Sequence, residues 1–165
     1  MNITSTHVFF WDGPFSQWYT RPSTLPLFQE DGVQFLSAEH YMMYNKAALF
    51  NDMTIAAKIL KTASPRDVKA LGRQIKNFDS VVWDKFKLQI VIKGNLLKFS
   101  QNTGLLTQLL EHADKTFVEA SPYDKIWGIG LDENDERCLD ESKWLGQNLL
   151  GKALDVVAHK LKGLE

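Results

Sequence analysis

The amino-acid sequence predicts a mainly α-helical fold with a minor β element, arranged as one compact domain over residues 1–165. Three observations lead to this prediction. Helix start signals and apolar residues at helical spacing recur from Ser37 to the end of the chain. Strand-like runs are short and few. With 165 residues, of which 44% are hydrophobic and 24% charged, the chain has the size and composition of a single globular domain.

The first 36 residues are expected to form short strands joined by loops, because aromatic residues are mixed there with Gly, Pro and Ser. The runs HVFFW (7–11) and VQFL (33–36) have strand character. Asp-Gly pairs at residues 12–13 and 31–32 are turn signals. A third strand is expected in KTFVEAS (115–121), which has a Thr-Phe-Val run.

Six helices are expected in the rest of the chain. Ser37 is the expected N-cap of the first, and Ser64, Pro65 and Asp67 together form a start signal for the third. Gly72 is unusual inside a helix; it allows either close packing of another element or an inward reach of Arg73 toward a phosphate. The expected ranges are about 38–50, 53–63, 65–76, 80–101, 104–113 and 143–162.

Charge and cysteine usage limit the protein classes. The net charge of −1 gives no global attraction to nucleic acid or to an anionic membrane, although a local basic cleft stays open as an alternative. Cys138 is the only cysteine, which fits a cytoplasmic protein without an intrachain disulfide. We expect no membrane partner, because no apolar run is long enough to span a bilayer and the N-terminal residues do not resemble a signal peptide.

The stretch FLSAEHYMMYNKA (35–47) combines charged residues with Met and Tyr. Glu39, Met43 and Lys46 are spaced i, i+4, i+7 and therefore share one helix face, with Lys46 about 10 Å along the axis from Glu39. This face offers a carboxylate at one end and a cation at the other, which suits a ligand with a reacting centre and a phosphate. Taken alone, the pattern is better described as an acid that favours a helix start and a solvated lysine.

Two further stretches contain candidate ligand-binding residues. In VEASPYDKIWGIG (118–130), Glu119 and Asp124 precede Trp127, whose flanking glycines allow close approach of backbone to a ligand beside a stacking ring. In FFWDGPFSQWY (9–19), Trp18 and Tyr19 lie among turn residues. The alternatives are a structural Trp in an ordinary turn and loop aromatics that fill a minor core.

No metal site is expected. The four His residues lack zinc-ligand spacing, and the acidic run DENDERCLDE (132–141) lacks the central Gly of a calcium-binding loop, so a solvated loop is the better interpretation. Neither a nucleotide-binding Gly-rich loop nor a GxSxG motif occurs.

Several blocks of the sequence together resemble the NADAR family, the YbiA-like N-glycosidases. These blocks are GPFSQWY, FLSAEHYMMYNKA, LGR, EASPYDKIWGIGL and KWLGQNLLGKAL, and they span residues 9–158 in the family's order. The resemblance implies a compact, mainly α-helical YbiA-like fold and an enzyme that hydrolyses N-glycosidic bonds of ribose. The implied substrates are ADP-ribose-related, including ADP-ribosylated guanine in nucleic acid, or ribosylaminopyrimidine phosphates of the riboflavin pathway. No cofactor is implied, and the oligomeric state stays open.

The resemblance also assigns roles to individual residues. It implies that Glu39 is the main catalytic carboxylate, with Glu119 or Asp124 as the second one. The residues implied to bind substrate are Trp18, Tyr19, Met43, Lys46, Arg73, Trp127, Gly128 and Asn148. Gln17 and Trp18 depart from the family pattern, which commonly has Asn and Phe there, so they are expected to alter the pocket wall.

These residue types suit the chemistry, because N-glycoside hydrolysis passes through an oxocarbenium-like ribosyl cation. A carboxylate at Glu39 can stabilise that cation or act as general base toward water. Lys46 and Arg73 can pair with phosphate oxygens, and Trp127 can stack on a base. The alternatives are a non-catalytic module that binds ADP-ribose or a nucleotide, a NAD glycohydrolase and a helical scaffold protein.

Overall fold

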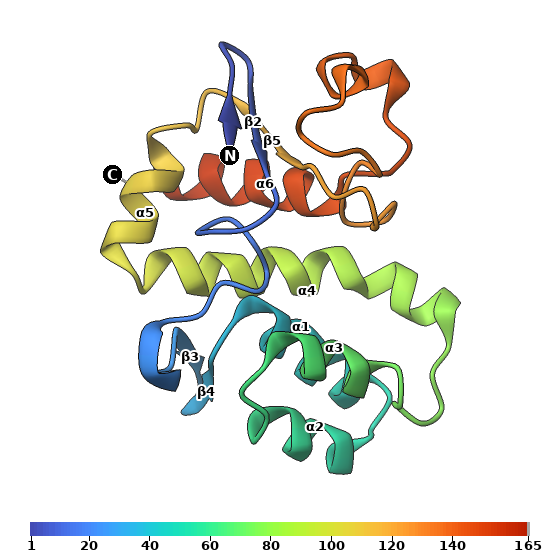
Figure 1. Cartoon of the computed structure of the whole chain (residues 1–165). Coiled ribbons are helices and arrows are strands. Elements are labelled where there is room, and N and C mark those ends of the chain that lie inside the picture. Colours follow the sequence, from blue (N-terminus) through green and yellow to red (C-terminus); the bar gives the residue numbers. More distant parts are fainter. Residues whose placement is uncertain (165) are drawn as a thin grey trace. The chain divides into compact units, whose positions relative to one another are not determined.

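The computed structural model describes residues 1–164 and confirms a mainly α-helical fold with small sheets (Figure 1). The helices are α1 (Ala38–Leu49), α2 (Met53–Leu60), α3 (Pro65–Gly72), α4 (Ser80–Ser100), α5 (Thr103–Leu110) and α6 (Leu149–Lys162). The strands are β1 (Asn2–Ile3), β2 (His7–Phe10), β3 (Phe28–Glu30), β4 (Val33–Phe35) and β5 (Thr116–Glu119). Short 3-10 turns lie at Pro22–Thr24, Glu136–Leu139 and Glu141–Lys143.

The chain divides into two compact units, which are described separately. We call residues 17–102 the helical unit, and residues 1–16 together with 103–164 the sheet unit.

In the helical unit, α1 packs against α2, α3 and α4 (Figure 1). The antiparallel β3–β4 hairpin turns at Asp31 and Gly32, both at positive φ, as the Asp-Gly pair predicts. Phe28 and Phe35 face each other across the hairpin with ring centroids 5.6 Å apart, and both rings pack on Tyr41 of α1. These buried aromatics join the hairpin to the start of α1.

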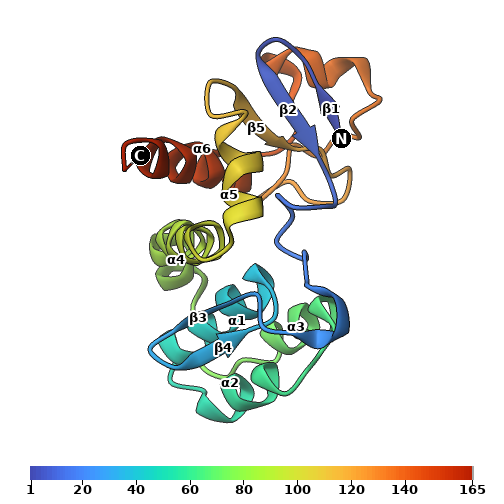
Figure 2. The same cartoon turned by 90° about the vertical axis from the view of Figure 1, so that its left-hand side faces the viewer.

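In the sheet unit, the strand order is β1-β2-β5, with β1 antiparallel and β5 parallel to β2 (Figure 2). α6 packs on β5, and α5 contacts α6. Buried residues occupy both faces of the paired strands, including Phe9 and Phe10 of β2 and Phe117 and Val118 of β5. This burial explains why the two strands read as apolar runs instead of alternating patterns.

Local capping chemistry sets most helix starts. The N-cap side chains of Ser37, Asp52, Ser64 and Asp79 each accept a hydrogen bond from a backbone amide in the first turn of α1, α2, α3 and α4 respectively. The start of these four helices is therefore readable from the sequence.

Two expected helix boundaries were wrong by four residues or more, and the second and fifth helices end at Leu60 and Leu110, three residues earlier than expected. The third helix ends at Gly72 and not near residue 76, because the amides of Arg73 and Gln74 form turns to Ala70 and Leu71. The last helix begins at Leu149 and not at about Lys143. The preceding Asn148 has a left-handed backbone (φ 52°, ψ 42°) that a helix cannot include. Strands β1 and β3, of two and three residues, were not expected.

Gly151 and Gly104 provide a matched test of packing. A Cβ on Gly151 would lie 2.1 Å from the Phe117 carbonyl oxygen, whereas one on Gly104 would meet nothing within 4 Å. We expect Gly151→Ala to lower the free energy of unfolding by about 2 kcal/mol or more, because α6 must move away from β5. Gly104→Ala in α5 should be neutral or stabilising by up to about 1 kcal/mol. Urea unfolding measures the free energy of unfolding of both variants. Equal changes in the two variants would contradict the close packing of α6 on β5.

Asp155 should make stability depend on pH. Burial raises the pKa of its carboxyl from 3.8 to about 6, although the Phe117 amide donates to Asp155 Oδ1 at 2.9 Å and opposes the shift. The folded state therefore holds this proton more tightly than the unfolded state, and the stability contributed by Asp155 falls as pH rises from about 4 to about 6. Asp155→Asn keeps an acceptor for the amide, so its melting temperature should match wild type near pH 4 and exceed it near pH 7. A pH-independent difference would contradict this expectation.

Candidate active site

The first turn of α1 holds a buried carboxylate. Ser37 Oγ accepts from the backbone amide of His40 at 3.2 Å, and Glu39 lies in the turn that this cap begins. The side chain of Glu39 is buried, with 3% of the residue exposed. Its backbone amide donates to the Gln17 carbonyl oxygen at 2.9 Å. The positive end of the helix favours negative charge at this position, which offsets part of the cost of burying it.

His40 supports packing and does not face a ligand. Its ring is buried, with Nδ1 2.6 Å from Ser37 Oγ and Nε2 2.7 Å from the Thr62 carbonyl oxygen. Because a carbonyl only accepts, Nε2 carries the proton and the ring joins α1 to the end of α2. Burial lowers the pKa of His40, while the Thr62 bond raises it.

Gln17 supports the same turn from outside the helix. Asn95 Nδ2 of α4 donates to Gln17 Oε1 at 2.8 Å and to the Val91 carbonyl oxygen at 2.9 Å. Both amide side chains are buried. Gln17 therefore fixes the position of the Glu39 backbone through its own carbonyl, a role that the sequence did not reveal.

Lys46 lies at the other end of the α1 face, and the exposed Arg73, the residue after α3, is a neighbouring cation. Lys46 Nζ donates to the Gly72 carbonyl oxygen at 3.0 Å and forms no ion pair within residues 1–164. Burial lowers the pKa of Lys46, the charge of Glu39 raises it and the charge of Arg73 lowers it again. In the described part of the chain, the Arg73 guanidinium makes neither a hydrogen bond nor an ion pair. The two neighbouring cations therefore keep most of their hydrogen-bonding capacity for an anion.

Met43 lies between Glu39 and Lys46 and packs against α3. A Cβ on Gly72 would lie 2.1 Å from Met43 Sδ, so a larger residue at this position would displace the Met43 side chain. Of the two explanations for Gly72, close packing of another element is confirmed. Met43 itself is buried, with 6% exposed.

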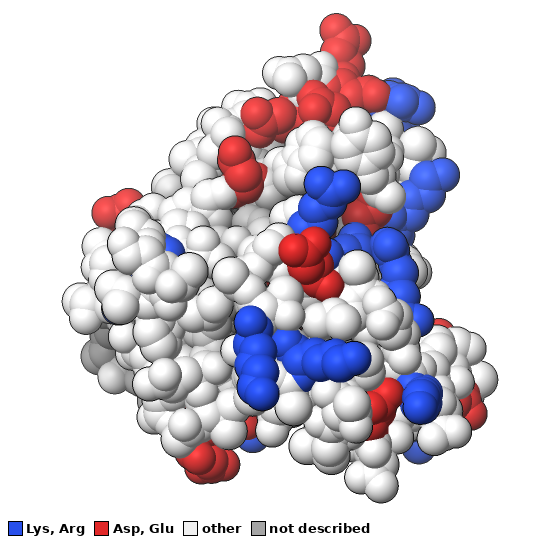
Figure 3. All heavy atoms as spheres, turned by 60° about the horizontal axis from the view of Figure 1, so that its bottom comes forward, with Lys and Arg blue, Asp and Glu red and all other residues white. Residues whose placement is uncertain are grey.

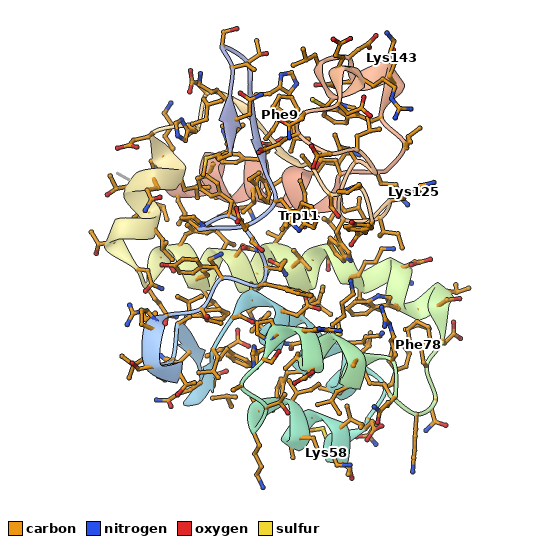
Figure 4. All side chains as sticks on the ribbon, in the orientation of Figure 1. Phe9, Trp11, Lys58, Phe78, Lys125 and Lys143 are labelled. Atoms are coloured by element: carbon orange, nitrogen blue, oxygen red, sulfur yellow. The ribbon has the colours of Figure 1, made fainter. Side chains whose placement is uncertain are left out.

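Two aromatic residues near Lys46 were missed from the sequence. Its ammonium lies 4.6 Å from the ring centroid of Phe78 and 5.5 Å from that of Trp83. Phe78 lies in the loop that leads into α4 (Figure 4), and Trp83 lies in the first turns of that helix. Contacts of cations with ring faces hold the ammonium in place. They arise from tertiary packing, which no local motif shows.

Trp18 and Tyr19 lie at the beginning of the helical unit. Trp18 is 44% exposed. The Tyr19 ring centroid is 5.5 Å from the ammonium of Lys98, a fully buried residue of α4. Burial lowers the pKa of Lys98 to about 7. The burial of Lys98 was not predicted, because a lysine within an amphipathic helix is ordinarily solvated.

The sheet unit contains the other predicted carboxylates. Glu119 is the last residue of β5 and is half-buried. Asp124 Oδ1 accepts from the amides of Ile126 and Trp127, each at 2.8 Å, and so closes the turn before Trp127. A Cβ on Gly128 would lie 2.9 Å from the carbonyl oxygens of both Asp124 and Glu119. Gly128 therefore lets the loop around Trp127 fold tightly against β5.

Asn148 binds the backbone of β5 with both ends of its amide. Its Nδ2 donates to the Phe117 carbonyl oxygen at 3.0 Å, and its Oδ1 accepts from the Glu119 amide at 3.0 Å. The residue is 2% exposed. In this way Asn148 completes the hydrogen bonding of β5 opposite β2 and fixes the backbone of Glu119.

Backbone hydrogen bonds join residues 145–150, which we call the 145–150 segment, to the Trp127 loop. The amides of this segment donate to carbonyls of residues 125–129, with bonds Leu145–Ile129, Gln147–Lys125, Asn148–Gly128, Leu149–Ile126 and Leu150–Trp127 of 2.8–3.1 Å. A Cβ on Gly146 would lie 2.3 Å from the Gly128 carbonyl oxygen. This close approach is the structural reason for Gly146, the first glycine of the GQNLLG block.

The structure thus places the predicted residues in two groups. Within the helical unit, α1 and the end of α3 bring together Glu39, Met43, Lys46 and Arg73. Within the sheet unit, β5, the Trp127 loop and the 145–150 segment bring together Glu119, Asp124, Trp127, Gly128 and Asn148.

Other features of the described residues do not add to the site. A groove of about 400 Å³ between α1 and α4 is lined by the opposite face of α1, including Tyr41 and Asn45, and by Phe86 and Lys93. None of the predicted site residues lines it.

Within residues 1–164 no three His, Cys, Asp or Glu side chains are placed to hold a metal ion. No helix in that range is long and apolar enough to cross a membrane. Figure 3 shows Lys and Arg side chains gathered in groups beside acidic ones, so the net charge of −1 conceals local basic surface.

The fold and these residues define a domain of the NADAR class. The NADAR domain family matches residues 9–162, and the chain belongs to this family. The solution structure of the Escherichia coli protein YbiA has the same fold, with a TM-score of 0.75 and 26% identity, covering 99% of this chain and 90% of that one. The predicted family and YbiA-like fold are therefore confirmed.

Two relatives bear on activity. An N-glycosidase of Acanthamoeba polyphaga mimivirus is 49% identical over 140 residues, covering 85% of this chain and 82% of the relative. A riboflavin biosynthesis protein of Vibrio vulnificus is 28% identical over 79% of this chain, but the match covers only 32% of that protein. The first similarity confirms the prediction of a glycosidase-type hydrolase at the level of the family.

Proposed function

We propose that this protein is an N-glycosidase that cleaves the bond between C1′ of a phosphate-bearing ribose and a base nitrogen. The observation that carries this proposal is the α1 face, where the buried carboxylate of Glu39 lies at one end and the half-buried Lys46 lies at the other, with the exposed Arg73 after α3 as a neighbouring cation. A lysine whose pKa is lowered by burial, on one helix face with a buried carboxylate, is the kind of perturbed ionisable group that is found preferentially at functional sites.

Glu39 is the proposed catalytic carboxylate. As the bond to the base breaks, positive charge develops on the ribose ring, and a carboxylate beside C1′ stabilises it. The same carboxylate can take a proton from the attacking water, so that oxygen adds to C1′ while the bond electrons leave with the base. Burial and the helix start hold this side chain in place, which reduces the reorganisation needed during reaction.

Lys46 and Arg73 form the proposed anion subsite. Burial lowers the pKa of Lys46, the charge of Glu39 raises it and the charge of Arg73 lowers it further, and a bound phosphate would favour the charged form of this lysine. Arg73 can contact two phosphate oxygens at once, whereas Lys46 acts as a compact charge. Substrates with this chemistry are ADP-ribose-related compounds, including ADP-ribosylated guanine in nucleic acid, and ribosylaminopyrimidine phosphates.

In the sheet unit, Glu119 is a better candidate for proton transfer than Asp124. One oxygen of Asp124 already accepts two backbone amides that close its turn. The Glu119 backbone is fixed by Asn148 and by the Ile129 amide, which donates to its carbonyl oxygen at 3.0 Å, so its side chain projects from a defined position.

We also infer a cytoplasmic location, which the single buried cysteine supports.

Glu39→Gln tests the catalytic proposal. The amide keeps the shape of the side chain but cannot carry the charge, so turnover should fall about a hundred-fold or more. Mass spectrometry would detect freed base and sugar from ADP-ribosylated guanine in single-stranded DNA, free NAD, ADP-ribose and a ribosylaminopyrimidine phosphate. Glu30→Gln is the control, because Glu30 bonds Tyr41 and Lys93 instead of facing Lys46. Wild-type rates in a folded Glu39→Gln protein would refute the assignment.

Asn148→Gly tests whether the fixed backbone of Glu119 matters for turnover. Glycine tolerates the left-handed conformation but loses both bonds to β5. We expect kcat to fall about ten-fold or more with little change in KM, since small misplacements of catalytic groups are costly. Asp155→Ala is the matched control, because it removes a bond from α6 to Phe117 without touching Glu119. Equal kcat in both variants would show that Asn148 serves stability alone.

A further inference from the structure

Phe78 combines exposure with a fixed position beside the anion subsite. The residue is 45% exposed, although single exposed aromatics are common and carry no conclusion alone. What sets Phe78 apart is its contact with Lys46, whose ammonium lies 4.6 Å from the ring centroid. An anion bound by Lys46 would therefore lie next to this ring.

The loop that presents Phe78 is held on both sides. Before it, the Lys76 amide donates to Asp52 Oδ2 at 2.9 Å, and Asn77 has a left-handed backbone (φ 59°). After it, Asp79 caps α4, with Oδ1 accepting from the amides of Val81 and Val82 at 2.9 and 3.3 Å. The ring is thus held in place before a ligand arrives, which lowers the entropic cost of binding.

The contacts of the Phe78 ring leave part of its surface open. Phe50 meets it in an edge arrangement, with centroids 5.3 Å apart and an interplanar angle of 67°. The ammonium of Lys46 covers one face. Trp83, which also contacts Lys46, is only 9% exposed and offers no comparable surface. Of the two rings that contact Lys46, Phe78 is therefore the one that a ligand can reach.

We propose that Phe78 is a stacking position for a planar group, a nucleobase, of the ligand whose phosphate binds Lys46 and Arg73. This inference rests on the proposed function and narrows it. A nucleobase stacks on an aromatic face regardless of its hydrogen-bonding groups, and phosphate and base lie close together in a nucleotide. A ligand with phosphate and ribose but no base would use Lys46 and Arg73 and leave Phe78 unused.

The test compares two ligands, ADP-ribose and ribose 5-phosphate, by calorimetric titration. Phe78→Leu keeps an apolar side chain against Phe50 but removes the ring. We expect it to weaken ADP-ribose binding about five-fold or more and to leave ribose 5-phosphate binding within about two-fold. Phe78→Trp, which restores a ring, should recover ADP-ribose binding.

Phe86→Leu is the matched control, because Phe86 is similarly exposed at 38% and lines the groove on the opposite face of α1. It should bind both ligands as wild type does. Equal weakening of both ligands by Phe78→Leu would overturn the inference and show that the ring acts only by holding Lys46. Unchanged binding of both would also overturn it while leaving the anion subsite intact. If the wild-type protein binds neither ligand, or if Lys46→Gln binds both normally, the proposed anion subsite itself fails.

Discussion

The sheet unit depends on the close approach of two backbone segments. Residues 145–151 lie so near residues 117–129 that side chains at Gly146 or Gly151 would collide with the carbonyl oxygens of Gly128 and Phe117. Five backbone hydrogen bonds and both ends of the Asn148 amide use this proximity. Because buried backbone groups must find partners, the strand that ends at Glu119, the Trp127 loop and the start of α6 form one packed body. The positions of the Glu119 backbone and of Trp127 follow from this packing.

The helical unit is organised around buried charge. Glu39 lies at a capped helix start, where the helix dipole favours a carboxylate, and Lys46 lies between the Gly72 carbonyl and two aromatic rings. Burial nevertheless lowers the pKa of Lys46, the charge of Glu39 opposes this shift and the charge of Arg73 adds to it. A bound anion would favour the charged form of the lysine, in agreement with the proposed anion subsite.

Capping and turn chemistry were predictable because they act over a few residues. Ser37, Ser64 and the Asp31-Gly32 turn were identified from the sequence, and the structure places them as expected. Tertiary contacts were not predictable in this way. The last helix was predicted to begin too early, because Asn148 has a left-handed backbone and its side chain bonds to β5. Residues near it in the sequence do not indicate either feature. The cation–ring contacts of Phe78, Trp83 and Lys98 were not predicted. They depend on tertiary packing, in which α4 and the loop before it meet α1 or Tyr19.

Family motifs mix two kinds of residue, and the structure separates them. Gly128, Gly146 and Gly151 are explained by backbone approach, Met43 by its packing on Gly72, and Asn148 by its bonds to β5. None of these needs a ligand to account for its chemistry. Lys46 and Arg73 differ, because the two cations lie near each other and neither forms an ion pair within residues 1–164. A motif match alone would weight all these residues equally. The proximity of these cations to each other and of Lys46 to the buried Glu39 directs attention to the α1 face, and ligand chemistry should first be sought there.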